Sequence, residues 1–517
     1  MARYGWARIL GGAILTALSL TAAHPLAAAS GAQTAAQLND LRIRLADLDE
    51  ALETDPRNRE VPLAELLHRH GLDRVASRLA AEERASEIGR ALRVSIPDTP
   101  AIAEKTDLRL VLTLLSQSYT TNDNRDVLFA AGPDDTMVQA FRGGEVTLGD
   151  LERAGVLRPA EGAVPAELIR PIVLWEDTRL RLSAGETLAL SRPGGAFIIS
   201  LGYVEIHGAE LVVAGGENRH SADFVPFLTI GGGGALSMID STVRGLGFGW
   251  TQKFSGVSIL AHPFMPPIGG SQIIRSHFDE IVTLVLAGTP DVRVMDNRFH
   301  DVRDNALRLA RSPRARVQGN LFFGDGPTNA IRLLDGTSDA VMSGNLLLGG
   351  DRAGILIGRG SNRVRVVGNV IWRRDGAAIK FDRTDCGYAS LNIALDGRQK
   401  GIELRQSPGM VLHRNLISGA HSSAIWISAQ PHGAVTRVTD NILSGNGEGF
   451  ATATARRLAL VGNDLTAQMP RLVSGDLVPQ NAAIAMDLKG RKPMLLSAGG
   501  PEHPPQLPQV CGSAGRP

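Results

Sequence analysis

One three-residue pattern recurs along the middle of this chain at a nearly constant spacing. Two apolar residues flank one variable residue, and successive copies begin 24, 24, 24, 23 and 23 residues apart. The copies are Leu307-Arg308-Leu309, Ile331-Arg332-Leu333, Ile355-Leu356-Ile357, Ile379-Lys380-Phe381, Ile402-Glu403-Leu404 and Ile425-Trp426-Ile427. Because successive side chains of a strand point to opposite sides, each copy predicts a short strand whose first and third residues face a core.

A second column repeats with the same period, and all its members are asparagine. The column consists of Asn297, Asn320, Asn345, Asn369, Asn392, Asn415, Asn441 and Asn463. Asparagine tolerates left-handed turns, and stacked asparagines can hydrogen-bond from one coil to the next. The column therefore predicts a structural ladder rather than a catalytic site. A leucine-rich repeat shares the period, but its Leu-x-x-Leu-x-Leu core is missing here.

These two columns predict an all-β solenoid, a right-handed parallel β-helix over residues 178–473, with a helical N-terminal extension. The stretch 30–105 has apolar residues at helical spacing and predicts a helical hairpin or short bundle. We expect it to cover the open N-terminal end of the solenoid, with a partner-binding module as the alternative. We predict that residues 106–177 form a mixed linker and that residues 474–517 form an irregular C-terminal cap and tail.

The first 29 residues predict a signal peptide. Two arginines precede an apolar run from Ile9 to Ala23, and Ala27-Ala28-Ala29 supplies the small residues that a signal peptidase needs. The run is too short to favour a membrane anchor, and no later segment predicts a membrane span. We therefore expect a periplasmic protein with no membrane span after signal cleavage.

Composition limits the classes of ligand. There are 54 Lys and Arg residues against 53 Asp and Glu residues, so no global field drives the chain onto nucleic acid. Cys386 and Cys511 can form one disulfide in an oxidising compartment, and their spacing predicts no metal site. We expect no cofactor, and any polyanion must bind at a local cluster of cations.

The outward positions of the repeat supply such a cluster. The middle residues of the copies read Arg308, Arg332, Leu356, Lys380, Glu403 and Trp426. A second column, two or three positions later, reads Arg311, Asp335, Arg359, Arg383 and Gln406. Cations on neighbouring coils can neutralise a polymer that carries a carboxylate on every sugar, and Arg suits bidentate carboxylate binding. An acidic polysaccharide is therefore the expected partner, against the alternative of an ordinary solvated face.

Several short motifs upstream of the repeat resemble a known family. They are Gly194-Gly195-Ala196-Phe197-Ile198, Phe224-Val225-Pro226-Phe227-Leu228, Gly245-Leu246-Gly247 and Lys253-Phe254-Ser255-Gly256-Val257-Ser258-Ile259. In order and spacing the chain over about residues 175–470 resembles the periplasmic poly-β-D-mannuronate (alginate) C5-epimerases. The resemblance implies a right-handed parallel β-helix, a signal peptide, and inversion at C5 of uronic-acid residues within a finished polymer.

The chain departs from this family at the catalytic coil. The family has Gly-Ile-Asp-Pro-His-Asp-Arg-Ser, whose histidine is the base, followed by a carboxylate-neutralising Arg on the next coil. Counting coils from Lys253 places residues 307–312 at the position of that motif. If the register is shifted by one coil, residues 354–359 match the coil that carries the neutralising Arg, and Asp335 matches the last Asp of the motif. Neither register offers a histidine at the base position.

The candidate site residues follow from these columns and from the resemblance. Catalytic candidates are Arg359, Asp335, Lys380 and His300. Substrate-binding candidates are Arg308, Arg311, Arg332, Arg383, Asp382, Lys253 and Trp426. A lysine within a cationic column can have a depressed pKa, which makes Lys380, beside Asp382, a candidate substitute for the base.

Three functions remain open at this point. One is a C5-epimerase-like enzyme with a substituted base, and a second is a polyuronate lyase, which starts with the same proton abstraction. The third is a catalytically inactive protein that binds or guides an acidic polysaccharide, with a periplasmic polymer export complex as a further partner. Fold alone does not decide among them.

Overall fold

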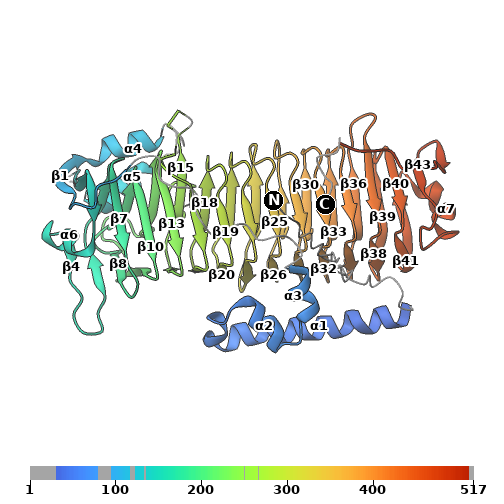
Figure 1. Ribbon diagram of the computed structural model, residues 1–517, viewed down its shortest axis with the longest axis horizontal. Helices are drawn as coiled ribbons and strands as arrows, with labels where there is room; N and C mark the ends of the chain where they lie inside the picture. Colours follow the sequence, from blue (N-terminus) through green and yellow to red (C-terminus); the bar gives the residue numbers. More distant parts are fainter. Residues whose placement is uncertain are drawn as a thin grey trace, which may run out of the picture.

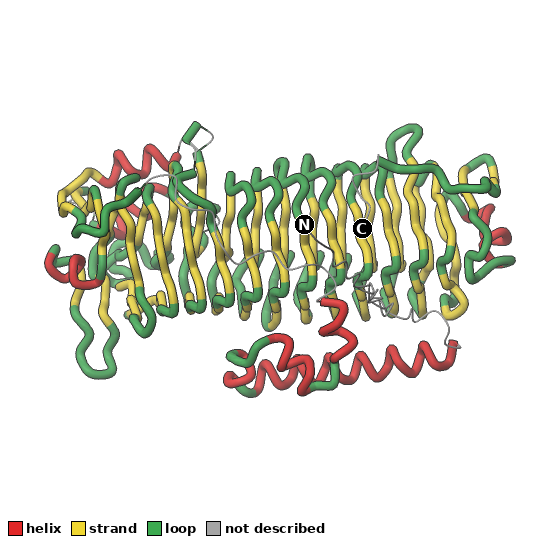
Figure 2. The backbone as a smooth tube through the Cα atoms, viewed as in Figure 1, coloured by secondary structure: helices red, strands yellow, loops and turns green. Residues whose placement is uncertain are grey.

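The computed structural model describes residues 31–79, 95–116, 123–132, 136–249, 251–262, 264–265 and 267–511. The predicted signal peptide lies outside the described residues. Most of the described chain forms a long parallel solenoid whose coils lie side by side along one axis (Figures 1 and 2). None of the described helices is long and apolar enough to cross a membrane.

Three sheets run along the solenoid, with 15, 15 and 14 strands in the described part of the chain. Sheet B contains β1 (Ile102–Asp107), β2 (Met137–Arg142), β6 (Ile172–Leu174), β9 (Ile198–Ser200), β12 (Leu228–Gly232), β15 (Gly256–Ala261), β18 (Thr283–Ala287), β21 (Leu307–Ala310), β24 (Ile331–Leu334), β27 (Ile355–Ile357), β30 (Ile379–Asp382), β33 (Lys400–Arg405), β36 (Ser423–Ser428), β39 (Glu448–Ala453) and β42 (Arg471–Gly475). Sheet A contains β3 (Gly144–Val146), β7 (Thr178–Leu182), β10 (Tyr203–His207), β13 (Ala235–Ile239), β16 (Gln272–Ile274), β19 (Arg293–Met295), β22 (Arg316–Gln318), β25 (Val341–Ser343), β28 (Arg365–Val367), β31 (Tyr388–Ser390), β34 (Val411–His413), β37 (Val435–Thr439), β40 (Arg457–Val461), β43 (Met494–Ser497) and β44 (Gly500–Glu502). Sheet C contains β4 (Leu157–Arg158), β5 (Ala166–Leu168), β8 (Thr187–Ser191), β11 (Glu210–Ala214), β14 (Thr242–Arg244), β17 (His277–Asp279), β20 (Arg298–His300), β23 (Leu321–Phe323), β26 (Leu346–Leu348), β29 (Val370–Trp372), β32 (Ile393–Leu395), β35 (Leu416–Ser418), β38 (Ile442–Ser444) and β41 (Asp464–Ala467).

The repeated triplets are strands of sheet B, as their alternation predicted. In β21, Leu307 and Leu309 are fully buried, whereas Arg308 between them is half-buried. Parallel register aligns Leu307 with Ile331 and Arg308 with Arg332 on the next coil. Because each coil visits sheets B, A and C in turn, the inward residues form one continuous apolar core along the solenoid.

The asparagine column is a buried ladder at the corner between sheets A and C. Asn369 accepts hydrogen bonds from the backbone N and from Nδ2 of Asn345, at 3.0 and 2.8 Å. Its own Nδ2 donates to the carbonyl oxygen of Met342 at 2.9 Å and to Oδ1 of Asn392 at 2.9 Å. The residue before each asparagine takes the left-handed conformation, for example Gly368 with φ of 65°. The ladder is therefore structural, as expected, although the asparagines do not occupy the left-handed position.

The helical N-terminal segment packs on the side of the solenoid. It comprises α1 (Gly31–Thr54), the 3₁₀ helix η2 (Pro56–Arg59), α2 (Leu63–Arg69) and α3 (Asp73–Leu79). In Figure 1 these helices lie below the solenoid, beside β26 and β32 of sheet C. Arg42 of α1 pairs with Asp396 at 2.8 Å, which fixes the docking. The expectation that this segment covers the N-terminal end of the solenoid is wrong.

The reason for this docking lies in sheet C, which is apolar on its outer face over five coils. The outward residues there are Leu321, Phe323, Leu346, Leu348, Val370, Trp372, Ile393, Leu395 and Leu416. The helical residues that bury them are Leu38, Leu45, Leu48, Leu52, Leu66, Leu67, Leu72 and Val75. Exposure of an apolar face of this length to water is unfavourable, and the amphipathic helices bury it.

The N-terminal end is covered by other elements. Strand β1 pairs antiparallel with β2, and α4 (Leu108–Ser116) and α5 (Asn124–Ala131) pack on a phenylalanine cluster beside it. A further helix, α6 (Leu148–Arg153), lies at the same end (Figure 1). Parallel pairing already begins between β2 and β6, so the solenoid starts within the stretch expected to be a linker.

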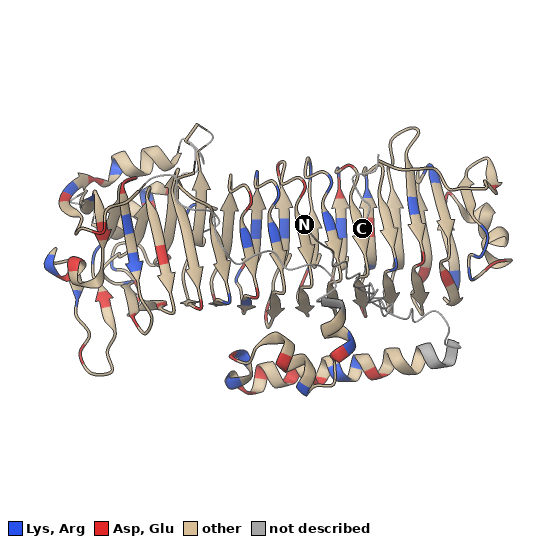
Figure 3. Cartoon of the chain, in the orientation of Figure 1, with Lys and Arg blue, Asp and Glu red and all other residues tan. Residues whose placement is uncertain are grey.

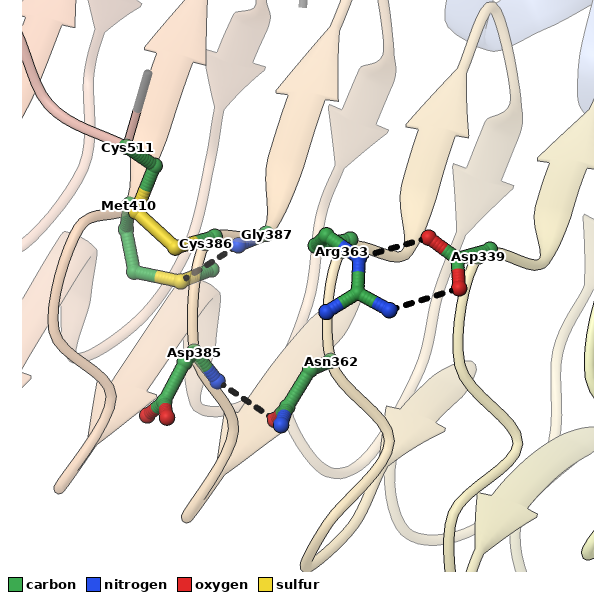
Figure 4. Close-up of a disulfide and its surroundings, with 8 residues drawn as sticks. All are labelled: Asp339, Asn362, Arg363, Asp385, Cys386, Gly387, Met410 and Cys511. Carbon is green, nitrogen blue, oxygen red and sulfur yellow. Dashed lines mark hydrogen bonds and ion pairs between the residues drawn. A yellow bond between two sulfur atoms is a disulfide. The ribbon is translucent and has the colours of Figure 1, made fainter. Parts of the chain in front are cut away.

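The C-terminal end is closed by β43, which pairs antiparallel with β40, and by η3 (Val478–Gln480) and α7 (Asn481–Ala485). From β44 the chain runs back along the solenoid, and Cys511 forms a disulfide with Cys386 (Figure 4). A side chain at Gly409 would collide with the sulfur of Cys511, so this glycine makes room for the returning chain. The disulfide anchors the C-terminal segment to the solenoid at Cys511.

We predict that Asn369→Ala destabilises the solenoid by about 3 kcal/mol or more, because several buried hydrogen-bonding groups lose their partner at once. Urea unfolding measures the loss, and hydrogen exchange should rise first in the coils on either side of Asn369. Gln399→Ala, at an exposed position, serves as the control. Equal unfolding midpoints for the two variants would contradict a structural role for the ladder.

Candidate functional site

The outward face of sheet B carries the column of variable residues that the repeat predicted. The strand register aligns Arg308, Arg332, Leu356, Lys380, Glu403 and Trp426 on consecutive coils. Neighbouring strands in a sheet lie about 4.8 Å apart, so these side chains follow one another along the solenoid axis. Figure 3 shows basic residues on neighbouring strands in the middle of the molecule.

This face is a basic stripe on a nearly neutral protein. Within β21, β24, β27, β30 and β33 and the two residues after each, there are eight basic residues and three acidic ones. The basic residues are Arg308, Arg311, Arg332, Arg359, Lys380, Arg383, Lys400 and Arg405, and the acidic ones are Asp335, Asp382 and Glu403. The excess is about one positive charge per coil, while the whole chain has a formal charge of +1.

A cluster of two lysines, a glutamate and a tryptophan occupies the C-terminal part of the stripe. Lys380 Nζ lies 3.0 Å from Glu403 Oε1, and Lys400 Nζ lies 3.1 Å from Glu403 Oε2. Lys400 Nζ also lies 4.9 Å from the ring centroid of Trp426, a cation–π distance. The Glu403 side chain is only 9% exposed, against 27% for Lys380, so the carboxylate lies beneath its lysines.

The two lysines control the ionisation of Glu403. Burial alone would raise the pKa of this carboxyl, but the hydrogen bonds and charges of Lys380 and Lys400 outweigh burial and hold the pKa below its ordinary value of 4.5. Glu403 is therefore ionised at neutral pH. Lys380 contacts Glu403 directly, so a lysine that served as a base here would have to give up this ion pair.

Arg332 differs from the lysines in having no acidic partner. No carboxylate of the described residues forms an ion pair with Arg332, and its buried Nε makes no hydrogen bond there. A guanidinium held in this way on an outward face is available to an anion from solution. Arg308 stands beside it on the preceding coil.

The second predicted column lies at the turn that follows sheet B. Arg311, Asp335 and Arg383 take left-handed backbone conformations there, with φ of 50°, 52° and 58°. These three side chains and that of Arg359 are exposed along one edge of the face. Arg383 pairs with Asp382 at 3.2 Å, and the other carboxylate oxygen of Asp382 is buried without a partner among the described residues.

Two predicted residues lie elsewhere. His300 is on β20 of sheet C, 8% exposed beneath the helical segment, where Nδ1 contacts Asp279 at 2.6 Å and Arg59 lies 3.4 Å away. Lys253 is fully buried near the N-terminal end, and its Nζ donates to Asn124 Oδ1 at 2.5 Å. The structure does not bring either residue to the basic stripe.

Two members of the stripe were missed from the sequence. Lys400 opens β33 three residues before Glu403, outside the repeated triplet, so the alternation did not select it. Arg405 aligns with Asp382 and is exposed at the edge of the face. Listing every outward position of each strand, rather than only the triplet centre, would have found Arg405.

The face carries many cations, but its described strands lack a histidine base. No described strand of sheet B contains histidine. Among the described residues, no three His, Cys, Asp or Glu side chains gather closely enough to hold a metal ion. The arrangement is suited to neutralise carboxylates along an extended polymer, and proton abstraction there would fall to Lys380 or Lys400.

Comparisons with known proteins agree on the fold. The family model described as "Right handed beta helix region" matches residues 284–465. The periplasmic alginate epimerase AlgG is 17% identical, with a TM-score of 0.58, over 74% of this chain and 94% of that chain. A second crystal structure of that protein, a single-site mutant, gives the same TM-score over 74% and 96% of the two chains, at 17% identity.

More remote solved structures include the AlgE6 A-module, a mannuronan C-5 epimerase of Azotobacter vinelandii. It is 12% identical with a TM-score of 0.33, over 59% of this chain and 85% of that one. A search of curated proteins finds no match. The family model and the AlgG structures establish the fold, a right-handed parallel β-helix.

We predict that Glu403→Gln lowers stability by about 1–2 kcal/mol at neutral pH, between the values typical of exposed and buried ion pairs. Because the folded-state pKa of Glu403 lies below its ordinary 4.5, the ionised pair stabilises the protein above pH 4.5 and loses this effect as the pH falls through the folded-state pKa. The difference between the proteins should therefore shrink in acid. Urea unfolding across this range measures it.

Glu50→Gln is the matched control, since Glu50 is exposed on α1. A stability difference for Glu403→Gln that stays constant from neutral pH to about pH 3, below the ordinary glutamate pKa, would contradict the ion-pair account.

Proposed function

We propose that this chain binds an acidic polysaccharide, a polyuronate, lengthwise along the outward face of sheet B. The observation that carries the proposal is the basic stripe, with an excess of about one positive charge per coil on a protein of net charge +1. Coils repeat at about 4.8 Å, so the stripe offers charge at short, regular intervals to an extended polyanion. Trp426, half-buried beside Lys400, offers a ring face on which a sugar can stack.

The cellular setting follows from two features that support each other. The first 29 residues predict export, and Cys386 and Cys511 are joined in a disulfide, which persists in oxidising compartments. We infer a periplasmic protein that meets the polymer after its synthesis.

A second candidate is C5-epimerisation of the bound polyuronate. It is favoured by the similarity in fold to the periplasmic alginate epimerase AlgG, which this chain matches over 94% of that chain's length. The reaction needs a cation at the substrate carboxylate, a base for the C5 proton and an acid on the opposite face. The arginines meet the first need. The base would be one lysine of the Lys380–Glu403–Lys400 cluster, which would first have to leave Glu403 and lose its proton to solvent.

We predict that Arg332→Ala weakens binding of polymannuronate by about fivefold, roughly 1 kcal/mol, because one charge-assisted contact is lost. The loss should shrink as salt rises, since exposed charges are screened. Affinity electrophoresis at several salt concentrations measures both effects. Arg57→Ala is the control: it removes the same charge from a side chain that is 91% exposed on η2, away from sheet B. Equal affinities of the two variants for polymannuronate would contradict the proposed binding face.

Incubation of the purified protein with polymannuronate in deuterated water separates binding from catalysis. Deuterium at C5 without new chain ends is the expected signature of epimerisation, read by proton NMR. Unsaturated chain ends, read by ultraviolet absorbance, would show a lyase instead. Binding with neither product would leave the protein a polysaccharide-binding β-helix and remove the second candidate.

A further inference from the structure

The last described part of the chain, residues 504–511, runs back along the solenoid and is held there by few contacts. We call it the returning segment. Its Leu507 and Val510 pack on a small apolar cluster of sheet A, which consists of Val435, Ala459 and Leu495. No backbone hydrogen bond joins the returning segment to another described residue. The disulfide between Cys511 and Cys386 is therefore the main restraint on this segment.

The disulfide starts from a column of corner residues between sheets B and A. One residue of each coil takes the left-handed conformation there, and its backbone N donates to a carbonyl of the next coil. The column reads Asp291, Arg314, Asp339, Arg363 and Cys386. Asp291 pairs with Arg314, and Asp339 pairs with Arg363, both at 2.7 Å (Figure 4 shows the second pair). The ion pairs join neighbouring coils, whereas Cys386 joins a segment that is distant in sequence.

The disulfide lies at the surface of the molecule. Cys511 is exposed, and Cys386 is half-buried. Gly409, with φ of 70°, leaves the space that the Cys511 sulfur occupies. A thiolate from solution can approach an exposed disulfide, and such disulfides are more easily reduced than buried ones. Reduction therefore does not require the solenoid to unfold first.

The disulfide closes a long loop that contains the C-terminal part of the solenoid. The two cysteines are 125 residues apart, and the strands from β31 to β44 lie between them. Because each coil of a solenoid contacts only its neighbours, coils at an end can open without the rest. A cross-link over a long loop restricts the opened chain, which makes opening less favourable. Lys400, Glu403 and Trp426 lie within the loop, whereas Arg332 precedes it.

We infer that this disulfide is a redox-sensitive latch on the C-terminal coils of the solenoid. A dithiol in solution supplies two electrons and two protons. The bond between the two sulfurs breaks, Cys386 and Cys511 become thiols, and the dithiol becomes a disulfide. The returning segment then leaves its apolar cluster on sheet A, and the last coils open more often. The latch itself needs no ligand, but its effect on the C-terminal part of the basic stripe rests on the proposed function.

Hydrogen exchange with and without dithiothreitol tests the latch in the whole chain. We expect reduction to raise exchange by about tenfold in β40 and β43, by less in β33 and β36, and not at all in β21 and β24. The double variant Cys386→Ser with Cys511→Ser is the matched control. It should show the raised exchange without dithiothreitol and should not respond to its addition.

Two results would overturn the inference. Exchange in β40 and β43 that dithiothreitol leaves unchanged means that the disulfide does not hold these coils closed. A rise spread evenly over all coils means a general loss of stability instead of a local latch. If the oxidised protein fails to bind polymannuronate, the proposed function is wrong and the latch stands, since hydrogen exchange needs no polymer.

Discussion

The asparagine ladder is the interaction on which the rest of the structure depends. A single coil of about 24 residues cannot bury its apolar side chains alone, so each coil is stable only when stacked in register on its neighbours. Asn345, Asn369 and Asn392 bind one another and the backbone at the corner between sheets A and C, and so fix both the turn and the register. Once register is fixed, every outward residue falls into a straight column. The basic stripe on sheet B is a consequence of this stacking.

The sequence predicted the part of the fold that follows from periodicity. Alternation in the triplets and the asparagine spacing were enough for the strands, the core and the column from Arg308 to Trp426. The docking of α1 was missed, although its signal is present: Leu346-Leu347-Leu348 and Val370-Ile371-Trp372 do not alternate in polarity, as a strand with a solvated outer face would. A strand that is apolar on both faces must be buried on both, and the helices predicted before the solenoid could have been assigned to its outer face.

Positions outside the repeat could not be predicted in the same way. Periodicity says nothing of contacts between distant segments, such as Arg42 with Asp396 or Cys386 with Cys511. His300 was a catalytic candidate from the sequence, yet each coil crosses three sheets, so residues close together in the chain can face different directions. His300 on sheet C and Arg308 on sheet B illustrate this. Sheet identity, not sequence distance, decides which side chains share a face.

The division between inward and outward positions also explains how one solenoid can serve different chemistry. Inward residues such as Leu309 and Ile331 are confined by the core, whereas outward ones such as Leu356 and Lys380 contribute little to packing and can vary. A histidine in the outward column would add a base without disturbing the fold. The described strands of sheet B have none, and the groups nearest to that task are lysines held by Glu403. Catalysis by a lysine on this face therefore depends on whether Lys380 or Lys400 can leave Glu403 and lose its proton.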